Sequence, residues 1–182
     1  MDALSSRRVY ANAWMTVRED TFRREDGSTG VYGVVDKPTY ALVIAVQDEH
    51  VHLVEQFRYP LGERRWEFPQ GTAPHRAELE PAVLARRELR EETGLQAGRL
   101  VLLGILDVAP GMCSQRGHVF LASDLVAGKP DREPEEQDMR SAWWTRTEFE
   151  HAVRDGRVGD AQTVAAYTLL LLHERSTSRP AR

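Results

Sequence analysis

Residues 87–95 read Arg-Glu-Leu-Arg-Glu-Glu-Thr-Gly-Leu, and this acidic run constrains the fold of the chain more than any other segment. Glu88, Glu91 and Glu92 are spaced i, i+3 and i+4, so a helix sets all three carboxylates on one face. Like charges this close repel each other, and clustered oxygen ligands of this kind suit Mg²⁺ or Mn²⁺. Arg87, one turn before Glu91, can hold that carboxylate in place and leave the other two to a metal ion.

Composition alone favours a plainer interpretation of this run, because a helix rich in Glu and Arg is usually a solvated surface laced with i, i+4 pairs. The neighbouring sequence changes that balance. Residues 66–71 read Trp-Glu-Phe-Pro-Gln-Gly, which predicts a short strand that stops at a proline and a glycine. Pro81 then favours the first turn of a helix, and Gly94 can end that helix in the left-handed conformation.

This order of strand, glycine loop and acidic helix resembles the Nudix box of the Nudix hydrolases, and the acidic run matches the core of that motif at every fixed position. The box departs from the family pattern in two places. Fifteen residues separate Gly71 from Arg87, where the pattern has thirteen, and Leu79 stands where the pattern has an earlier glutamate. Glu78 and Glu80 flank that position, and either could substitute after a shift of the loop.

The resemblance implies a divalent metal site and assigns its ligands. Glu88, Glu91 and Glu92 would bind the ion, Mg²⁺ or alternatively Mn²⁺, together with the backbone carbonyl of Gln70. Arg87 and Glu91 would also belong to the catalytic residues. Such an ion neutralises the charge of pyrophosphate oxygens and lowers the pKa of bound water, which is the chemistry needed to split a pyrophosphate bond.

A general base is predicted in the loop 134–139, which reads Pro-Glu-Glu-Gln-Asp-Met. An acidic loop of this kind can be merely solvated, and composition alone gives the two interpretations equal weight. The segment resembles the base-bearing loop of ADP-ribose pyrophosphatases, which implies that Glu135 or Glu136 accepts a proton from water. The sequence leaves these two residues as alternatives.

Residues 56–59, Gln-Phe-Arg-Tyr, support the same branch of the family. They resemble the stretch in which an arginine of ADP-ribose pyrophosphatases meets the substrate, and a guanidinium can bind phosphate by two hydrogen bonds. A strand-end salt bridge is the equally weighted alternative for Arg58. The resemblance also implies substrate contacts for Glu67 and Met112. Asp160 lies in a late segment similar to that branch, although helix capping is its simpler role.

Five aromatic side chains are candidate stacking platforms for a nucleobase, although aromatic residues on strands belong more often to the core. They are Tyr10, Trp14, Trp66, Trp143 and Trp144.

The pattern of the whole chain predicts an α/β protein. The resemblance implies a Nudix-like α/β/α sandwich with a mixed sheet and an N-terminal antiparallel β segment. We expect that β segment in residues 1–36, packing on or swapping with a partner in a homodimer, then a Nudix domain in residues 37–175 and a disordered tail in residues 176–182. Strands are predicted at 9–10, 14–23, 30–35, 40–46, 51–57, 99–108, 118–122 and 142–145, and helices at 81–92, 147–154 and 162–174.

Composition agrees with one enzyme-sized domain, because 182 residues with 41% hydrophobic content can bury a single core. A net charge of −4 supplies no basic field for nucleic acid, so the expected partner is a small nucleotide substrate. Cys113 is the single cysteine, which excludes an internal disulfide and fits a reducing compartment. No signal peptide or membrane-spanning stretch is recognised, and we expect a cytoplasmic protein.

The sequence therefore predicts a Mg²⁺-dependent enzyme that splits ADP-ribose or a related nucleotide sugar into a nucleoside monophosphate and a sugar phosphate. Residues 68–71, Phe-Pro-Gln-Gly, resemble the junction in Nudix diadenosine polyphosphate and RNA 5′-pyrophosphohydrolases, so dinucleoside polyphosphates or (d)NTPs are the first alternative substrates. Leu79 and the altered spacing motivate a second alternative, a non-catalytic nucleotide-sensing Nudix domain. The complete set of three acidic ligands in the core of the motif argues against that sensor.

Overall fold

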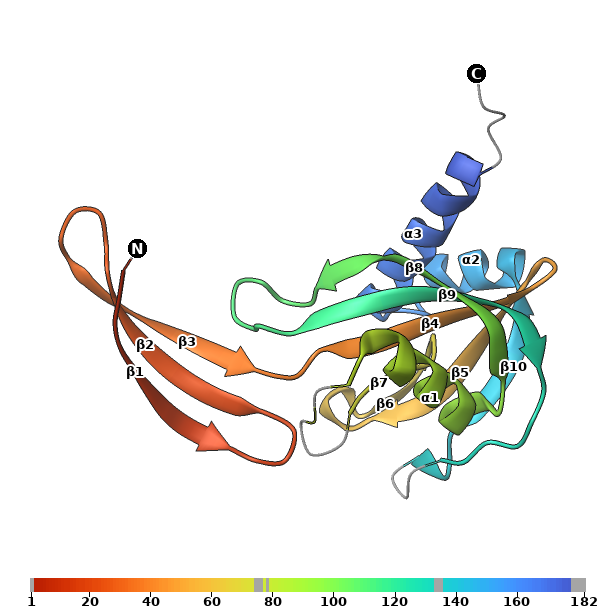
Figure 1. Cartoon of the computed structure of the whole chain (residues 1–182), viewed down its shortest axis with the longest axis horizontal. Coiled ribbons are helices and arrows are strands. Elements are labelled where there is room, and N and C mark those ends of the chain that lie inside the picture. Colours follow the sequence, from red (N-terminus) through yellow and green to blue (C-terminus); the bar gives the residue numbers. More distant parts are fainter. Residues whose placement is uncertain (1, 74–76, 78, 133–135, 178–182) are drawn as a thin grey trace.

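The computed structural model describes residues 2–73, 77, 79–132 and 136–177. Its N-terminal part is a three-stranded antiparallel sheet in the order β1 (Asp2–Ala11), β2 (Thr16–Arg23) and β3 (Thr29–Asp36). Figure 1 shows this sheet as an arm that extends away from the rest of the molecule. Gly27, in the turn between β2 and β3, has φ 83°, a conformation that glycine adopts without a Cβ clash. The predicted N-terminal antiparallel segment is therefore present.

β1 is longer than predicted, because it begins at Asp2 rather than at Val9. All ten of its residues are exposed, so the strand lacks the alternation of buried and exposed positions by which a sequence reveals a strand. It is recognisable only from its pairing with β2, which runs along its whole length.

The main sheet has seven strands and is mixed, as predicted. Its central order is β10-β5-β4-β9-β8, with β6 paired to β5 and β7 paired to β4. β4 and β9 are parallel, whereas the other pairs are antiparallel. The strands are β4 (Tyr40–Gln47), β5 (His50–Arg58), β6 (Glu63–Glu67), β7 (Gln70–Thr72), β8 (Gln96–Asp107), β9 (Arg116–Val126) and β10 (Arg140–Thr145), with a 3₁₀ turn, η1 (Tyr59–Leu61), between β5 and β6.

Helices cover both faces of this sheet. α1 (Pro81–Thr93) packs on one face, and α2 (Arg146–Arg154) and α3 (Ala161–Thr177) pack on the other. Both faces of β4 are buried because its side chains alternate between two hydrophobic cores. Ala41 and Val43 pack toward α1, and Leu42 and Ile44 pack toward α2 and α3. The layers seen in Figure 1 form the predicted α/β/α sandwich.

α1 begins and ends as the sequence predicted. Glu80 caps its first turn by accepting a hydrogen bond from Val83 N at 3.0 Å, and Pro81 occupies the first helical position. Gly94 ends the helix at φ 78°, and a Cβ there would lie 2.5 Å from the carbonyl oxygen of Gly128. Glycine is therefore required at this position both for the backbone conformation and for the close approach of the loop after β9.

Several predicted boundaries differ from the structure, for example β9, which runs from Arg116 to Val126 rather than over residues 118–122. The strand expected over residues 66–71 is divided into β6 and β7, because the chain crosses from pairing with β5 to pairing with β4 around Pro69, which has no N–H to donate. α3 continues through Thr177, two residues into the predicted tail, and the rest of that tail lies outside the described residues. Among the described helices, none is long and apolar enough to cross a membrane.

Candidate active site

Glu92 lies on the inner face of α1 and is fully buried. Neither of its carboxylate oxygens has a hydrogen-bond partner within the described residues. Burial, followed by the negative charges of Glu88, Glu136 and Glu67, raises the pKa of Glu92 well above its usual range. A buried carboxyl group without a partner is costly, so this position is built either for a proton or for a cation that the protein itself does not supply.

Glu88 lies one turn earlier on α1, is buried, and approaches the backbone of β7. A Cβ at Gly71 would stand only 2.2 Å from Glu88 Oε2, so the absence of a side chain at Gly71 leaves room for this carboxylate. The contact brings α1 against the short strand that begins with Gln70. The predicted carboxylate ligands Glu88 and Glu92 on α1 are thus adjacent to β7, which carries the predicted carbonyl ligand of Gln70.

Glu91 has different surroundings from its two neighbours. The Nε of Arg87 donates to Glu91 Oε1 at 3.0 Å and to Oε2 at 2.9 Å, and Arg90 Nη2 donates to Oε1 at 3.2 Å. The ion pair that the spacing predicted is therefore present. In this arrangement both Glu91 oxygens accept hydrogen bonds from arginine, while the oxygens of Glu92 accept none within the described chain.

The acidic residues fit a divalent cation only in part. Among the residues that the structure describes, no three His, Cys, Asp or Glu side chains converge to form an ion site by themselves. Glu92 has two buried oxygens without a protein partner, and Glu88 adds a second hard oxygen donor nearby. Backbone carbonyls and water commonly complete the coordination of such ions, and Gln70 is the predicted carbonyl donor.

The earlier glutamate of the box is not replaced by an inward-facing carboxylate in the described part of the chain. Leu79, which occupies its position, is 40% exposed. Glu80 is the N-cap of α1, and its carboxylate accepts a hydrogen bond from Val83 N. Glu78, the other substitute considered, lies outside the described residues, as do His75 and Arg76 of the same loop.

Arg58, at the end of β5, is held by Glu67 of β6. Arg58 Nη2 lies 2.6 Å from Glu67 Oε1, Nε donates to Oε2 at 3.3 Å, and Gln56 Nε2 donates to Oε1 at 2.6 Å. Glu67 is almost fully buried, and burial raises its pKa, while the charge of Arg58 opposes that rise. The strand-end salt bridge considered for Arg58 exists, and it also fixes the direction of the guanidinium.

Arg58 and Glu67 line a cavity of about 510 Å³ beside the acidic residues of α1. Gln70 links this cavity to the start of α3, because its Nε2 donates to Glu67 Oε2 and to Asp160 Oδ2, both at 3.2 Å. Asp160 caps α3 as the simpler interpretation had it, accepting from Thr163 N at 2.8 Å. The same carboxylate also lines the cavity, which a capping pattern does not reveal. Other lining residues that the sequence did not indicate are Lys37, Tyr40, Arg65, Gln115 and Gln162.

Met112 is separate from this cavity. It is 55% exposed in the loop between β8 and β9, where its carbonyl accepts a hydrogen bond from Val35 N at 2.8 Å. It is not among the described residues that line the cavity, so its substrate contact stays a prediction.

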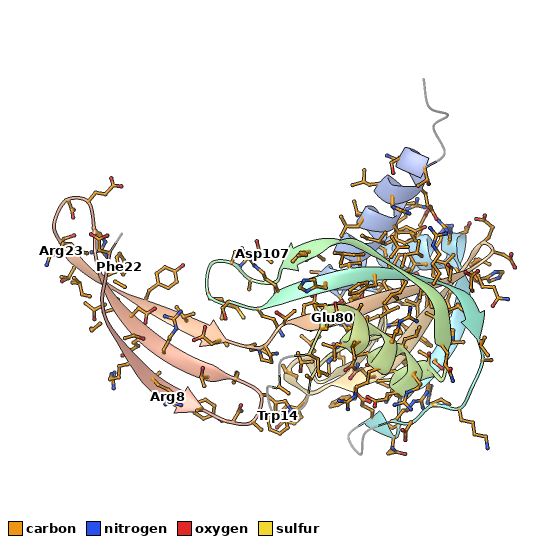
Figure 2. The ribbon with its side chains drawn as sticks, in the orientation of Figure 1. Arg8, Trp14, Phe22, Arg23, Glu80 and Asp107 are labelled. Carbon is orange, nitrogen blue, oxygen red and sulfur yellow. The ribbon has the colours of Figure 1, made fainter. Side chains whose placement is uncertain are left out.

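The tryptophans divide into two groups. The rings of Trp66 and Trp144 pack with centroids 4.9 Å apart, and Trp143 packs edge-on against the buried His52 at 4.7 Å. These three have the structural role that aromatic residues on strands usually have. Trp14 is 67% exposed, and Figure 2 places it at the end of the N-terminal arm that is nearer the main domain.

The loop after β9 brings Glu136 close enough for its charge to raise the pKa of Glu92. Arg132 connects the two residues through the backbone: its Nε donates to the carbonyl of Glu92 at 3.1 Å, and its Nη1 donates to the carbonyl of Met139. Met139 N in turn donates to the carbonyl of Glu136 at 2.9 Å. A single guanidinium thus ties α1 to the turn that carries Glu136. Glu135, the alternative base, lies outside the described residues.

We expect Arg132→Lys to lower kcat about tenfold while leaving KM nearly unchanged, because an ammonium group cannot hold both carbonyls in the fixed geometry of a guanidinium. Steady-state kinetics of the purified variant would measure this. Arg140→Lys is the matched control, since Arg140 is exposed and makes only a 3.8 Å contact with Glu55. A tenfold loss in both variants would show that the effect is not due to the Arg132 contacts.

A mixed sheet between helical layers, with buried carboxylates beside an open cavity, fits a metal-assisted hydrolase. Comparison with known proteins agrees. Residues 36–167 match the family model of the NUDIX domain, and residues 1–35 match that of the nucleoside diphosphate sugar hydrolase N-terminal domain. The chain therefore belongs to the Nudix hydrolase family, whose members generally depend on a divalent metal ion.

Several characterised relatives span nearly the whole chain. An ADP-ribose pyrophosphatase of Mycobacterium tuberculosis is 32% identical over 178 residues, which cover 97% of this chain and 84% of the relative. An ADP-ribose pyrophosphatase of Bacillus subtilis is 30% identical over 173 residues, covering 94% and 92%. A crystal structure of an ADP compounds hydrolase superposes with a TM-score of 0.84 over 98% of this chain and 96% of that one, at 21% identity, which supports the fold.

Proposed function

We propose that this protein hydrolyses the pyrophosphate bond of a nucleoside diphosphate sugar, with ADP-ribose as the first candidate, to a nucleoside monophosphate and a sugar phosphate. The observation that carries the proposal is the buried carboxylate of Glu92, which has no hydrogen-bond partner in the described part of the chain and lies beside Glu88 and near a cavity lined by Arg58. The two ADP-ribose pyrophosphatase relatives, which match along almost the full chain, support the choice of substrate.

Glu88 and Glu92, with the carbonyl of Gln70, would hold a divalent cation, and we propose Mg²⁺, with Mn²⁺ as a substitute. When bound, such an ion neutralises the pyrophosphate charge and makes water easier to deprotonate. Glu91, held by Arg87, would keep the acidic face of α1 in position and could contribute a further oxygen. Each of these residues belongs to α1, which packs on one face of the sheet, or to β7, which pairs with β4, so the ligands would be preorganised.

Arg58 and the base would act on the two reacting groups. The guanidinium of Arg58, oriented by Glu67, would bind a phosphate oxygen of the substrate. Glu136 or Glu135 would accept a proton from the attacking water, whose oxygen forms a new bond to one phosphorus while the bridging P–O bond breaks. The second phosphate leaves with the electrons of that bond. The products are then two phosphate monoesters.

A substrate panel tests this proposal. Phosphate released by added phosphatase would report turnover of ADP-ribose, GDP-mannose and diadenosine tetraphosphate, which have no free terminal phosphate. Released pyrophosphate would report turnover of dNTPs, and each substrate would be tested with Mg²⁺ and with Mn²⁺. We expect a nucleotide sugar to be turned over fastest. Preference for diadenosine tetraphosphate or a dNTP would instead support the alternative Nudix pyrophosphohydrolase, and nucleotide binding without any turnover would support the sensor.

We further propose that the protein is a cytoplasmic homodimer that associates through its N-terminal arm. The arm exposes large hydrophobic side chains, and Tyr10, Trp14, Val31 and Tyr32 are each at least 43% exposed. Grouped exposed hydrophobic residues often mark a protein–protein interface. We expect light scattering to give twice the chain mass of 20.7 kDa, and deletion of residues 1–35 to leave a monomer. A full-length protein that is monomeric at micromolar concentration would contradict the dimer, and cell fractionation would test the location.

A further inference from the structure

Tyr40 is a buried side chain whose hydroxyl group the described residues leave without a hydrogen-bond partner. It begins β4, is 5% exposed and borders the cavity that contains Arg58. Buried hydroxyl groups in folded proteins are nearly always hydrogen-bonded, so an exception next to a cavity requires an explanation.

The position of this hydroxyl is nonetheless well defined by packing. Tyr40 pairs with Gly117 of the parallel strand β9, and its ring lies over that glycine. A Cβ at Gly117 would stand 2.3 Å from the Tyr40 hydroxyl oxygen, so the sequence leaves room for the ring only because residue 117 is glycine. A phenylalanine at position 40 would make the same apolar contacts, so packing alone does not explain why this residue carries a hydroxyl group.

Two of the polar groups that line the same cavity, Asp160 and Glu67, are carboxylates held by hydrogen bonds. Asp160 lies near enough for its negative charge to add to burial in raising the pKa of Tyr40, which therefore remains a protonated donor at neutral pH. Gln70 Nε2 bridges Asp160 and Glu67, so two carboxylates stand on this side of the cavity. Lys37, Arg58 and Arg65 also line this cavity and suit the phosphates. A carboxylate repels phosphate, whereas the hydroxyl groups of a neutral sugar can donate to Asp160 and accept from the phenol of Tyr40.

We propose that Tyr40 and Asp160 form a subsite for the sugar hydroxyl groups of the nucleoside diphosphate sugar, in the cavity that Arg58 also lines. This inference rests on the proposed pyrophosphatase function and specifies which end of the substrate enters the cavity. The phenol donates one hydrogen bond to a sugar oxygen, and Asp160 accepts one from a sugar hydroxyl. A site built around such groups rejects an analogue that lacks the hydroxyls.

Tyr40→Phe tests the subsite with two esters of ADP: ADP-ribose, and P²-ethyl ADP, which keeps the pyrophosphate and lacks the sugar hydroxyls. We expect the kcat/KM of the variant to fall at least about tenfold for ADP-ribose and to stay within twofold for the ethyl ester. The Tm of Tyr40→Phe should equal or exceed that of the unchanged protein, because the hydroxyl has no partner in the free structure. The selectivity ratio and the Tm together separate a lost substrate contact from a damaged fold.

Tyr167→Phe is the matched control, because the Tyr167 hydroxyl is already used in donating to Glu150 at 2.9 Å. It should lower stability without changing the ratio of the two esters. Turnover of ADP-ribose that is equally fast in Tyr40→Phe would overturn the subsite while leaving the proposed function intact, as would an equal loss on both esters. Absence of pyrophosphate hydrolysis by the unchanged protein would instead overturn the proposed function, and the subsite with it.

Discussion

Glu92→Gln is expected to reduce nucleotide-sugar hydrolysis by about 10²–10³-fold, the loss typical when one main electrostatic contact to the reacting charge is removed. Glutamine keeps the shape of the side chain and removes the negative charge, so the effect reports on the charge alone. The buried oxygens of Glu92 have no other partner among the described residues that could explain such a loss. Initial rates at saturating Mg²⁺ would measure it. Glu25→Gln, in the exposed turn of the N-terminal arm, is the matched control and should leave the rate unchanged.

The same variant should be more stable than the unchanged protein when metal is absent. The folded-state pKa of Glu92 is raised above its ordinary value of 4.5, so the folded protein binds more protons than the unfolded chain between these two pKa values. Stability of the unchanged protein therefore falls as pH rises from about 4.5 through that interval. Glu92→Gln has no carboxyl group at this position and so does not lose this stability as pH rises. Its Tm in EDTA should exceed that of the unchanged protein by at least about 2 °C at pH 8. A lower Tm at every pH would contradict this account of the buried charge.

Gly71→Ala is expected to lower kcat about 10–100-fold with little change in stability. The added methyl group would lie 2.2 Å from Glu88 Oε2, so the carboxylate has to move away from β7. Because the displaced group is the end of a flexible side chain, the fold can absorb the change, but the predicted metal ligand, Glu88, cannot keep its place. Titration with Mn²⁺, followed by rate, should show a weaker apparent affinity for the ion as well as a lower maximum.

Gly33→Ala in β3 is the control for that experiment, because a Cβ there meets no atom within 4 Å. The two substitutions add the same methyl group to a strand, and only one of them reaches a predicted ligand. Equal kinetics for Gly71→Ala and the unchanged protein would mean that the Glu88 position does not matter for the reaction. The carboxylates that bind the ion would then lie elsewhere in the protein.

The local features of the site could be predicted from the sequence. The spacing of Arg87 and Glu91 is enough to predict their ion pair, since residues four apart on a helix are neighbours whatever the rest of the fold does. Gly94 as the helix end is predictable for the same reason. The fold class followed from the order of strands and helices and from the resemblance, and it is confirmed.

The distant contacts could not be predicted. Gln70 and Asp160 are 90 residues apart, and no local pattern says that one amide joins their two elements. The exposed strand β1 has no period-two pattern, so its first seven residues were missed. The spacing from Arg87 separated Glu91 from the other two carboxylates, but it could not show that Glu92 would be fully buried, because that burial depends on elements remote in sequence.

The contact between Gly71 and Glu88 has a consequence for how this chain can vary in length. The two residues meet in the structure although the box between them is two residues longer than the family pattern. β7 ends at Thr72 and α1 begins at Pro81, and each element is anchored to β4 independently. Insertions between two such anchors cost little, since doubling a loop adds only about 0.6 kcal/mol of closure entropy. We therefore expect insertions between Ala73 and Glu80 to be tolerated, while a single residue added between Arg87 and Glu92 would rotate part of the acidic face by about 100° and separate its carboxylates.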